Sequence, residues 1–359
     1  MKYRVARILA EESLSASGTK TIDLKVAEPI SRIELRYKYT KGSDAMIAHP
    51  AKDITKIELV DGSDVLHSLS GYENQGLCIY DRKVPTMCHG QHLTACSEEI
   101  VLGIDFGRFL WDPLLALDPK KFANPQLKIT YDSDLSDASS TSPVLEVFGY
   151  LFDEKAITPT GFLMSKELYN AACPAENSYK YVELPTDYPI RQMIIRGFED
   201  AHEPWDAVKE IRLDEDNRKR IPFDYEIEEY LRMMKGVWQA VEEMCIMSLT
   251  TSARIFYVTP TDYYATLIAN ALGGASTLYP ATWQPGGKFS MTAGSTQSAM
   301  GVARGYLPNH CIQFPFGLPG EPDDWYDVTK KGSIRLRVKG GSEGASAEFQ
   351  VALQQLRKY

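Results

Sequence analysis

Apolar and polar residues alternate along most of the chain, which is the pattern of strands that bury one face. In the first half the alternation marks six segments, at residues 21–26, 32–37, 54–60, 64–69, 126–131 and 145–150. The sequence Asp-Gly-Ser-Asp between the third and fourth segments is typical of a hairpin turn. Because these strands follow one another without regularly interposed helices, the pattern predicts an antiparallel sandwich and not a parallel sheet.

The second half of the chain repeats the sequence of the first. Residues 21–36 read TIDLKVAEPISRIELR and residues 181–196 read YVELPTDYPIRQMIIR, and the two stretches align without a gap, so that Arg36 meets Arg196. The strand pattern of residues 208–213 then answers that of residues 54–59. Self-similarity of this kind indicates a duplicated structural unit.

The ends of the two halves also match. A loop with Trp111 precedes a strand, a Ser- and Asp-rich link and a last strand in the first half. A loop with Trp325 precedes a strand, a Gly- and Ser-rich link and a last strand in the second. The matched order predicts an all-β fold of two tandem β-sandwiches, each of about eight strands, with a few short helices.

We place the boundary between the two sandwiches after residue 158, so that the domains are residues 1–158 and 159–359. The alternation predicts which side chains of the paired openings enter the two cores, because successive side chains of a strand point to opposite faces. The expected core residues are Ile22, Leu24, Ile33 and Leu35 in the first sandwich and Val182, Leu184, Met193 and Ile195 in the second.

Two segments of the second half depart from the repeated plan. Residues 225–247 carry apolar side chains at helical spacing with acidic side chains opposite, which predicts an amphipathic helix. Residues 270–310 are rich in Gly, Ser, Thr and Pro, which predicts a long, exposed and ordered loop.

Charge and cysteine content narrow the functional classes. The first half carries 18 basic and 23 acidic residues before Pro159, and the second carries 21 and 25, so neither half is basic and direct nucleic-acid binding is not expected. The six cysteines form no CxxC pair, which is typical of free thiols in a reducing compartment. No sequon, signal peptide or membrane-length apolar run is found, so we expect a soluble protein made in the cytosol.

The segment CHGQHLTAC is the best candidate for a metal site, because Cys88, His89, His92 and Cys96 are zinc ligand types. A straight helix could not close all four around one ion, and a loop with polar side chains is the simpler interpretation. A bicupin enzyme is a second possibility, but His89 and His92 are three residues apart and would face opposite sides of a strand.

Other catalytic patterns also fail. Gly-Gly-Ser-Glu-Gly at residues 340–344 matches a nucleophile elbow, but it joins two expected strands where a helix should follow. The acidic pairs Glu98-Glu99 and Asp323-Asp324 are expected to be solvated loop residues. We therefore predict no enzymatic activity, no catalytic, cofactor-binding or metal-binding residues, and no cofactor.

With its two repeated halves, the chain resembles the double jelly-roll major capsid proteins of icosahedral viruses. These are the coat proteins of the lineage of tectiviruses, corticoviruses and adenoviruses, and the chain resembles those of lipid-containing bacteriophages most. The resemblance rests on the paired openings at residues 21–36 and 181–196, the hairpin at 54–69, and the paired closings with Trp111 and Trp325. It spans essentially the whole chain, and it implies that each sandwich is a jelly roll.

The resemblance implies a structural coat protein that assembles as pseudo-hexagonal homotrimers into an icosahedral shell. Its partners would be further copies of itself, minor capsid or vertex proteins and spike proteins, and its location the virion, after assembly in the host cytoplasm. Residues 270–310 would form an outward tower. The N-terminal segment, with Lys2, Arg4 and Arg7 beside apolar residues, would face an inner membrane or simply start a helix.

A carbohydrate-binding or glycan-processing double β-sandwich protein is the alternative. An exposed aromatic platform formed by Tyr279, Trp283 and Tyr306 would suit such a protein. The missing secretion signal and sequons count against it.

Overall fold

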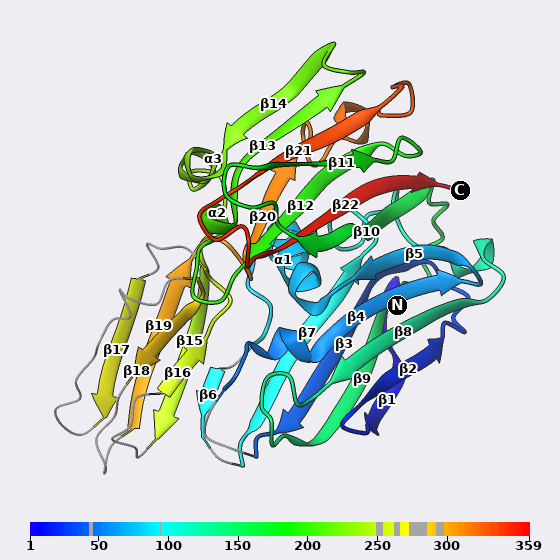
Figure 1. The fold of residues 1–359 in the computed structure, drawn as a ribbon. Coiled ribbons are helices and arrows are strands. Elements are labelled where there is room, and N and C mark those ends of the chain that lie inside the picture. The colour runs from blue at the N-terminus through cyan, green and yellow to red at the C-terminus, as the bar shows by residue number, and fades with distance from the viewer. Residues whose placement is uncertain are drawn as a thin grey trace.

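The computed structural model of the protein describes residues 1–42, 46–88, 90–93, 95–248, 254–261, 266–272, 286–291 and 298–359. Two β-sandwiches lie next to each other, and a smaller β unit projects beside them at the lower left of Figure 1. Among the described residues no helix is long and apolar enough to cross a lipid bilayer.

The first sandwich packs the sheet β1-β9-β3-β7 on the strands β2-β8-β4-β5 around one apolar core. Gly62 has a φ of 62° in the predicted turn between β4 and β5, a conformation that glycine adopts at little cost. The strands are β1 (Tyr3–Ser13), β2 (Ser17–Asp23), β3 (Ile30–Thr40), β4 (Ile54–Asp61), β5 (Asp64–Leu69), β7 (Ser97–Asp105), β8 (Pro125–Asp132) and β9 (Thr141–Phe152).

The second sandwich has the same strand order as the first. Its sheets are β10-β22-β12-β20 and β11-β21-β13-β14, so each strand has a counterpart at the same place in the first sandwich. This topology confirms the tandem jelly rolls, whereas the boundary after residue 158 stays a prediction. The strands are β10 (Gly161–Ala172), β11 (Tyr179–Leu184), β12 (Ile190–Phe198), β13 (Val208–Glu215), β14 (Arg220–Glu226), β20 (Cys311–Pro315), β21 (Ile334–Gly340) and β22 (Glu348–Lys358).

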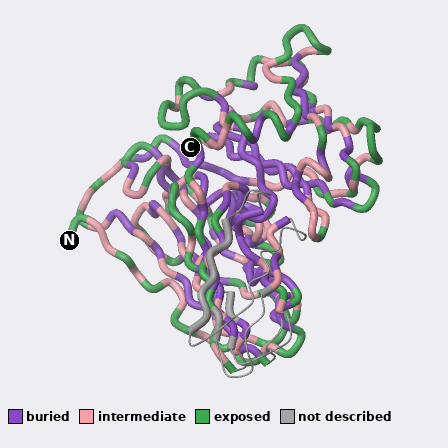
Figure 2. Tube along the Cα trace, turned by 90° about the vertical axis from the view of Figure 1, so that its left-hand side faces the viewer, coloured by how far each residue is buried: buried purple, intermediate pink, exposed green. Residues whose placement is uncertain are grey.

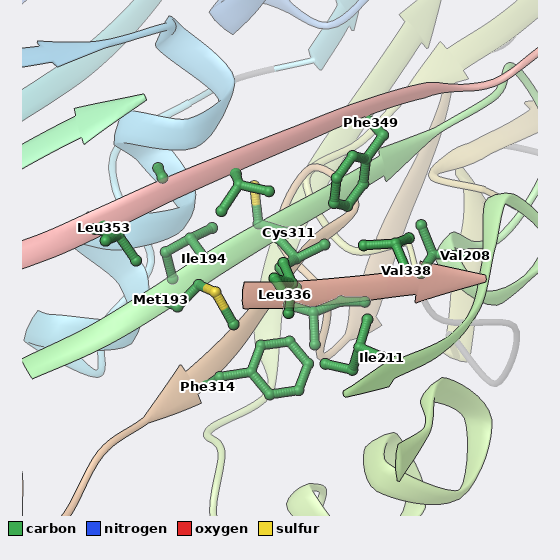
Figure 3. Packing of buried hydrophobic residues seen from close by; sticks show 14 of the residues in the cluster. Met193, Ile194, Val208, Ile211, Cys311, Phe314, Leu336, Val338, Phe349 and Leu353 are labelled. Carbon is green, nitrogen blue, oxygen red and sulfur yellow. The ribbon is translucent and has the colours of Figure 1, made fainter. Parts of the chain in front are cut away.

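Each jelly roll has its own apolar core, and all eight core residues predicted from the alternation are buried. Figure 3 shows the core of the second roll, where Met193 and Phe314 meet Leu336 between the two sheets. In Figure 2 the buried segments run through the interior of both rolls and the exposed segments follow the outer loops. Burial of apolar side chains between two sheets is the main stabilising contribution in such a fold.

The two rolls are joined by strand pairing and by a helix. β5 pairs in parallel with β10, with His67 opposite Ser165 and Ser68 opposite Lys166, which merges one sheet of each roll into a single eight-stranded sheet. The helix α1 (Gly71–Arg82) follows β5 and lies between the rolls, at the centre of Figure 1.

The amphipathic helix predicted at residues 225–247 is wrong in extent. The structure has a short helix, α3 (Ile227–Met234), followed by the strand β15 (Val241–Ser248). The chain leaves the helix at Gly236, and from Val241 to Met247 the odd-numbered residues are buried while the even-numbered ones are more exposed. That period of two belongs to a strand.

The exposed loop predicted at residues 270–310 is also corrected where the structure describes it. The strands β17 (Thr266–Leu272), β18 (Lys288–Met291) and β19 (Ser298–Gly305) lie there, whereas residues 273–285 and 292–297 are outside the described residues. They form small sheets with β15, β16 (Arg254–Tyr257) and β6 (Gly90–His92), around a core of residues such as Phe256 and Phe289. We call this unit, β15 to β19 with β6, the insert.

The N-terminal segment is strand β1 rather than the start of a helix. Its cations are engaged within the first roll: Arg4 pairs with Glu28 and Asp153, and Arg7 pairs with Glu146. The strand conformation follows from pairing with β9, which satisfies the backbone groups of the segment.

Candidate assembly surfaces

Helix α1 forms the joint between the two rolls, and the sequence signals its start. Ser70 is the N-cap: its hydroxyl accepts a hydrogen bond from the backbone N–H of Glu73, and the Glu73 carboxylate accepts one from the backbone N–H of Ser70. Lys83 ends the helix in a left-handed conformation. The strand pattern of the sequence did not predict this helix, although Ser-x-x-Glu is a capping-box signal.

Asp81, near the end of α1, is the centre of a buried polar network that reaches into the second roll. Its carboxylate accepts hydrogen bonds from Arg191 (2.6 Å), Gln192 (2.8 Å) and Gln354 (2.9 Å), all three from the sheet of β12 and β22. Gln313 donates to Gln192 and so extends the network to β20. Because the side chains of Asp81 and Arg191 are buried, their pairing offsets the free-energy cost of removing each charge from water.

Glu73, in the first turn of α1, is buried beside a second carboxyl group. Burial and the nearby Glu167 of β10 raise the pKa of Glu73 to about 8. The Glu73 carboxyl group therefore holds a proton at neutral pH, where an exposed glutamate would be ionised. The joint between the rolls therefore contains two buried carboxyl groups: that of Glu73, which is protonated, and that of Asp81, which is paired with Arg191.

The side of the second roll that carries α3 is apolar and exposed. Met233 and Val237 have 61% and 70% of their surface exposed, and Leu318 and Phe109 lie exposed nearby. Two adjoining hollows of about 430 and 250 Å³ share Met234 and Pro315 as lining residues. The larger hollow is lined by the stacked rings of Phe223, Tyr225, Tyr230 and Phe314. Exposed apolar side chains beside aromatic hollows are typical of a protein–protein contact.

Two strands lie at matching sheet edges. β14 is the last strand of the sheet β11-β21-β13-β14, and β1 is the first strand of the sheet β1-β9-β3-β7. Their counterparts, β5 and β10, pair with each other inside the chain. Edge strands offer backbone groups for pairing with another chain.

The metal candidate at Cys88–Cys96 is only partly described. His89 lies outside the described residues. Nε2 of His92 lies 2.5 Å from the carbonyl oxygen of Ile255, and the Cys96 thiol donates to the carbonyl of Leu93. Among the described residues, Cys88 instead groups with His49 and Glu243, and their ligand atoms all lie within 4.8 Å of one another.

The hydrogen bonding of His49 does not fit a metal ion in this group. Nδ1 of His49 accepts the backbone N–H of Ala51 at 3.1 Å, so the ring proton is on Nε2, the atom that faces Glu243 and Thr259. A metal on Nε2 would move that proton to Nδ1, against the N–H of Ala51, whereas a ligating histidine donates its other N–H to an acceptor. Burial raises the pKa of Glu243, but hydrogen bonds from His49 and Thr259 bring it below its ordinary value. The group ties the first roll to the insert.

The other residues considered for catalysis lie in ordinary structural positions. Glu98 and Glu99 lie on β7 and not in a solvated loop, because the strand buries Glu98 beside Lys41 and brings Glu99 to Arg36. Asp323 and Asp324 are exposed, as expected. Residues 340–344 connect β21 with β22, so the serine there does not lie on a strand-to-helix turn.

The aromatic platform of the carbohydrate alternative is only partly described, since Tyr279 and Trp283 lie outside the described residues. Tyr306 is half-buried and packs against the core of the second roll. The ammonium of Lys235 lies over its ring, 5.6 Å from the centroid. This position is that of a packed side chain and not of an open platform.

Comparison with solved structures identifies the fold. The chain is similar to a chain of Sulfolobus turreted icosahedral virus (11% identity, 99% of this chain and 90% of that chain, TM-score 0.61). It is also similar to the major capsid protein P2 of bacteriophage PM2 (11%, 99% and 98%, TM-score 0.57) and to a chain of the PBCV-1 virus capsid (8%, 99% and 93%, TM-score 0.59). No family model matches the sequence. No curated protein matches it either. The shared feature is the double jelly-roll fold over the whole chain.

Proposed function

We propose that the protein is the major capsid protein of an icosahedral virus and that it assembles through copies of its own internal joint. The observation that carries the proposal is the repeated strand order. The α3 side of the second roll is structurally equivalent to the α1 side of the first. The sheet β1-β9-β3-β7 of the first roll is equivalent to the sheet β10-β22-β12-β20 of the second.

The joint inside the chain uses the α1 side of the first roll and the sheet β10-β22-β12-β20 of the second. The two matching faces remain open, one on each roll, and they are unlike each other. Contacts between unlike faces generate rings when the rotation closes. If each further contact repeats the internal one, three chains place six jelly rolls in a pseudo-hexagonal ring.

The register inside the chain indicates how two copies would meet. β5 is joined to β10 through His67 and Ser165. The counterpart of His67 is Phe223 of β14, and that of Ser165 is Val5 of β1, by the pairings within each sheet. Val5 is exposed, and Phe223 lines the larger hollow. β14 of one copy would therefore pair in parallel with β1 of the next, with α3 covering the contact.

The rest of the proposal follows from this assembly. The insert would project from the ring as a tower, minor capsid, vertex and spike proteins would bind the assembled shell, and an inner membrane would lie below it. The protein would act without enzymatic turnover, and its acidic halves would not bind nucleic acid directly. It would reside in the virion after assembly in the host cytoplasm, with rolls divided after residue 158.

Light scattering coupled to size-exclusion chromatography tests the trimer. The wild-type protein should have a mass three times 40.3 kDa. The double variant Met233→Asp, Val237→Asp should be a folded monomer, because it places two charges in an interface that must exclude water. Tyr181→Asp is the control: Tyr181 is also exposed, at 47%, but lies on β11, and this variant should stay trimeric. A wild-type monomer or dimer, or a double variant that remains trimeric, would contradict the proposal.

A further inference from the structure

The repeated arginines Arg36 and Arg196 have different surroundings in the two rolls. Arg36 of β3 lies among three carboxylates. Its Nε and Nη2 donate to the two oxygens of Glu99, at 2.7 and 3.0 Å, and its Nη1 lies 3.3 Å from Glu146 and 3.6 Å from Glu11. This is a fork-to-fork ion pair, the strongest form of arginine–carboxylate contact.

In the second roll the two positions equivalent to Glu146 and Glu99 carry amides. Arg36 is opposite Glu146, and Arg196 is opposite Gln350. Glu99 lies two residues before the partner of Arg36 on β7, and Asn309 lies two residues before the partner of Arg196 on β20. Both rolls carry the arginine, and the two carboxylates beside it are present in the first roll only.

The Arg196 guanidinium is nevertheless more deeply buried than that of Arg36. The residue is 4% exposed, and its guanidinium carbon lies 4.5 Å from the ring centre of Tyr72 and 4.4 Å from that of Phe198. Nε donates to the carbonyl of Asn309 and Nη1 to the side-chain oxygen of Gln350. In the part of the chain that the structure describes, Arg196 forms no ion pair, and no acceptor is found for Nη2. Burial of an unpaired cation costs several kcal/mol, so buried charges normally have a counter-charge.

Arg196 lines a cavity of about 260 Å³ where the two rolls and the insert meet. Among the described lining residues the other charged groups are Lys52 and Asp200, and Asp200 is already paired with Lys288 at 2.7 Å. Burial and the neighbouring Arg196 lower the pKa of His310, a lining residue, to about 3, so it is neutral. His49, the other lining histidine, points its proton at Glu243 and Thr259. The cavity thus has an excess of positive charge.

We propose that this cavity binds a small oxyanion, a carboxylate or a phosphate, with Arg196 as its charged ligand. In the first roll Nη2 of Arg36 donates to a carboxylate oxygen of Glu99, and the same atom of Arg196 is open to an oxygen of the ligand. Lys52 supplies a second positive charge. The volume exceeds that of several water molecules, so an anion of the size of acetate or phosphate has room. The anion replaces the carboxylates that the second roll lacks.

Isothermal titration calorimetry of the full-length protein tests this site. Sodium phosphate and sodium acetate are titrated separately, at constant ionic strength set with chloride, and saturable binding of at least one of them is expected. Which of the two binds identifies the class of anion. Arg196→Met keeps the packing between Tyr72 and Phe198 and should bind about ten- to a hundredfold more weakly, the loss expected for a charged hydrogen bond.

Arg36→Met is the matched control, because it removes the counterpart arginine outside the cavity and should leave the affinity unchanged. If Arg196→Met does not fold by circular dichroism, Gln350→Glu returns a carboxylate to the place of Glu146 and should abolish binding in a folded protein. Absence of saturable binding of both anions in the wild type would overturn the inference. Unchanged affinity in a folded Arg196→Met or Gln350→Glu variant would overturn it as well.

Discussion

Helices α1 and α3 follow the same strand in the two jelly rolls, but their surroundings are opposite. Nine of the 12 residues of α1 are buried, including Glu73, Asn74 and Gln75, whereas three of the eight residues of α3 are buried. α1 lies under the sheet of the second roll, and no sheet covers α3 in this way among the described residues. The burial of these helices is therefore set by the neighbouring roll. The same place in the repeated plan is an internal joint in the first roll and an outer surface in the second.

Removal of the Asp81 carboxylate should have the largest effect on this comparison. Asp81→Ala removes the carboxylate that pairs with the buried Arg191 and accepts from Gln192 and Gln354, and loss of one partner of a buried ion pair costs about 3–5 kcal/mol of unfolding free energy. Urea unfolding followed by circular dichroism measures the loss. Asp323→Ala, an exposed acid, is the control and should change little. A loss for Asp81→Ala below about 1 kcal/mol would show that the joint does not depend on this network.

Glu73 should make the unfolding free energy of the protein fall as the pH rises. Its pKa is 4.5 in an ordinary environment and about 8 in the folded protein. Between these values the folded state holds a proton that the unfolded chain has released. Its stabilising contribution is therefore complete below pH 4.5, falls by up to about 1.4 kcal/mol per pH unit as the pH rises, and is lost above pH 8.

Glu73→Gln tests this prediction because a glutamine resembles the protonated acid at every pH. Unfolding free energies measured from pH 5 to pH 8 should fall less steeply in the variant than in the wild type. Glu228→Gln is the control: Glu228 is an exposed acid in the first turn of α3, as Glu73 is in the first turn of α1, and this variant should reproduce the wild-type profile. Parallel profiles for wild type and Glu73→Gln would disprove the conclusion that Glu73 is protonated in the folded protein.

The smallest expected effect distinguishes the starts of the two helices. Ser70 caps α1 with its side chain, whereas Glu226 at the start of α3 makes no side-chain capping bond. Ser70→Ala should therefore cost about 1 kcal/mol in urea unfolding, the usual value of an N-cap. Glu226→Ala should be close to neutral. Equal losses in the two variants would mean that the cap does not stabilise α1 beyond the packing around it.

Much of the fold could be predicted from the sequence, because half-buried strands record their faces as alternation. Helix α1 could not be recognised by an apolar stripe, since its polar residues are buried against the second roll. The apolar spacing at residues 225–247 fits a helix up to Met234 and a strand from Val241, and only the local period of two after Gly236 separates them. Long segments with mixed periods are where such predictions fail.

The candidate surfaces were less predictable, because they depend on which strands become neighbours. Alignment of the repeats brought Arg36 and Arg196 together, but their partners lie on strands distant in the sequence. Asn309 and Gln350 have meaning only once the register of β20 and β22 is known. Cys88 is a similar case: it groups with His49 and Glu243, which lie far from it in the sequence.

The fusion of two jelly rolls into one chain has a consequence for how the protein can change over generations. A coat built from single rolls would carry every substitution at all positions of its ring. In the proposed ring a substitution alters one roll and leaves the other as it was, so an insertion, a lost charge or a new contact is tried at alternate positions only. The insert after α3 and the different partners of Arg36 and Arg196 are two differences between the rolls that this arrangement would allow.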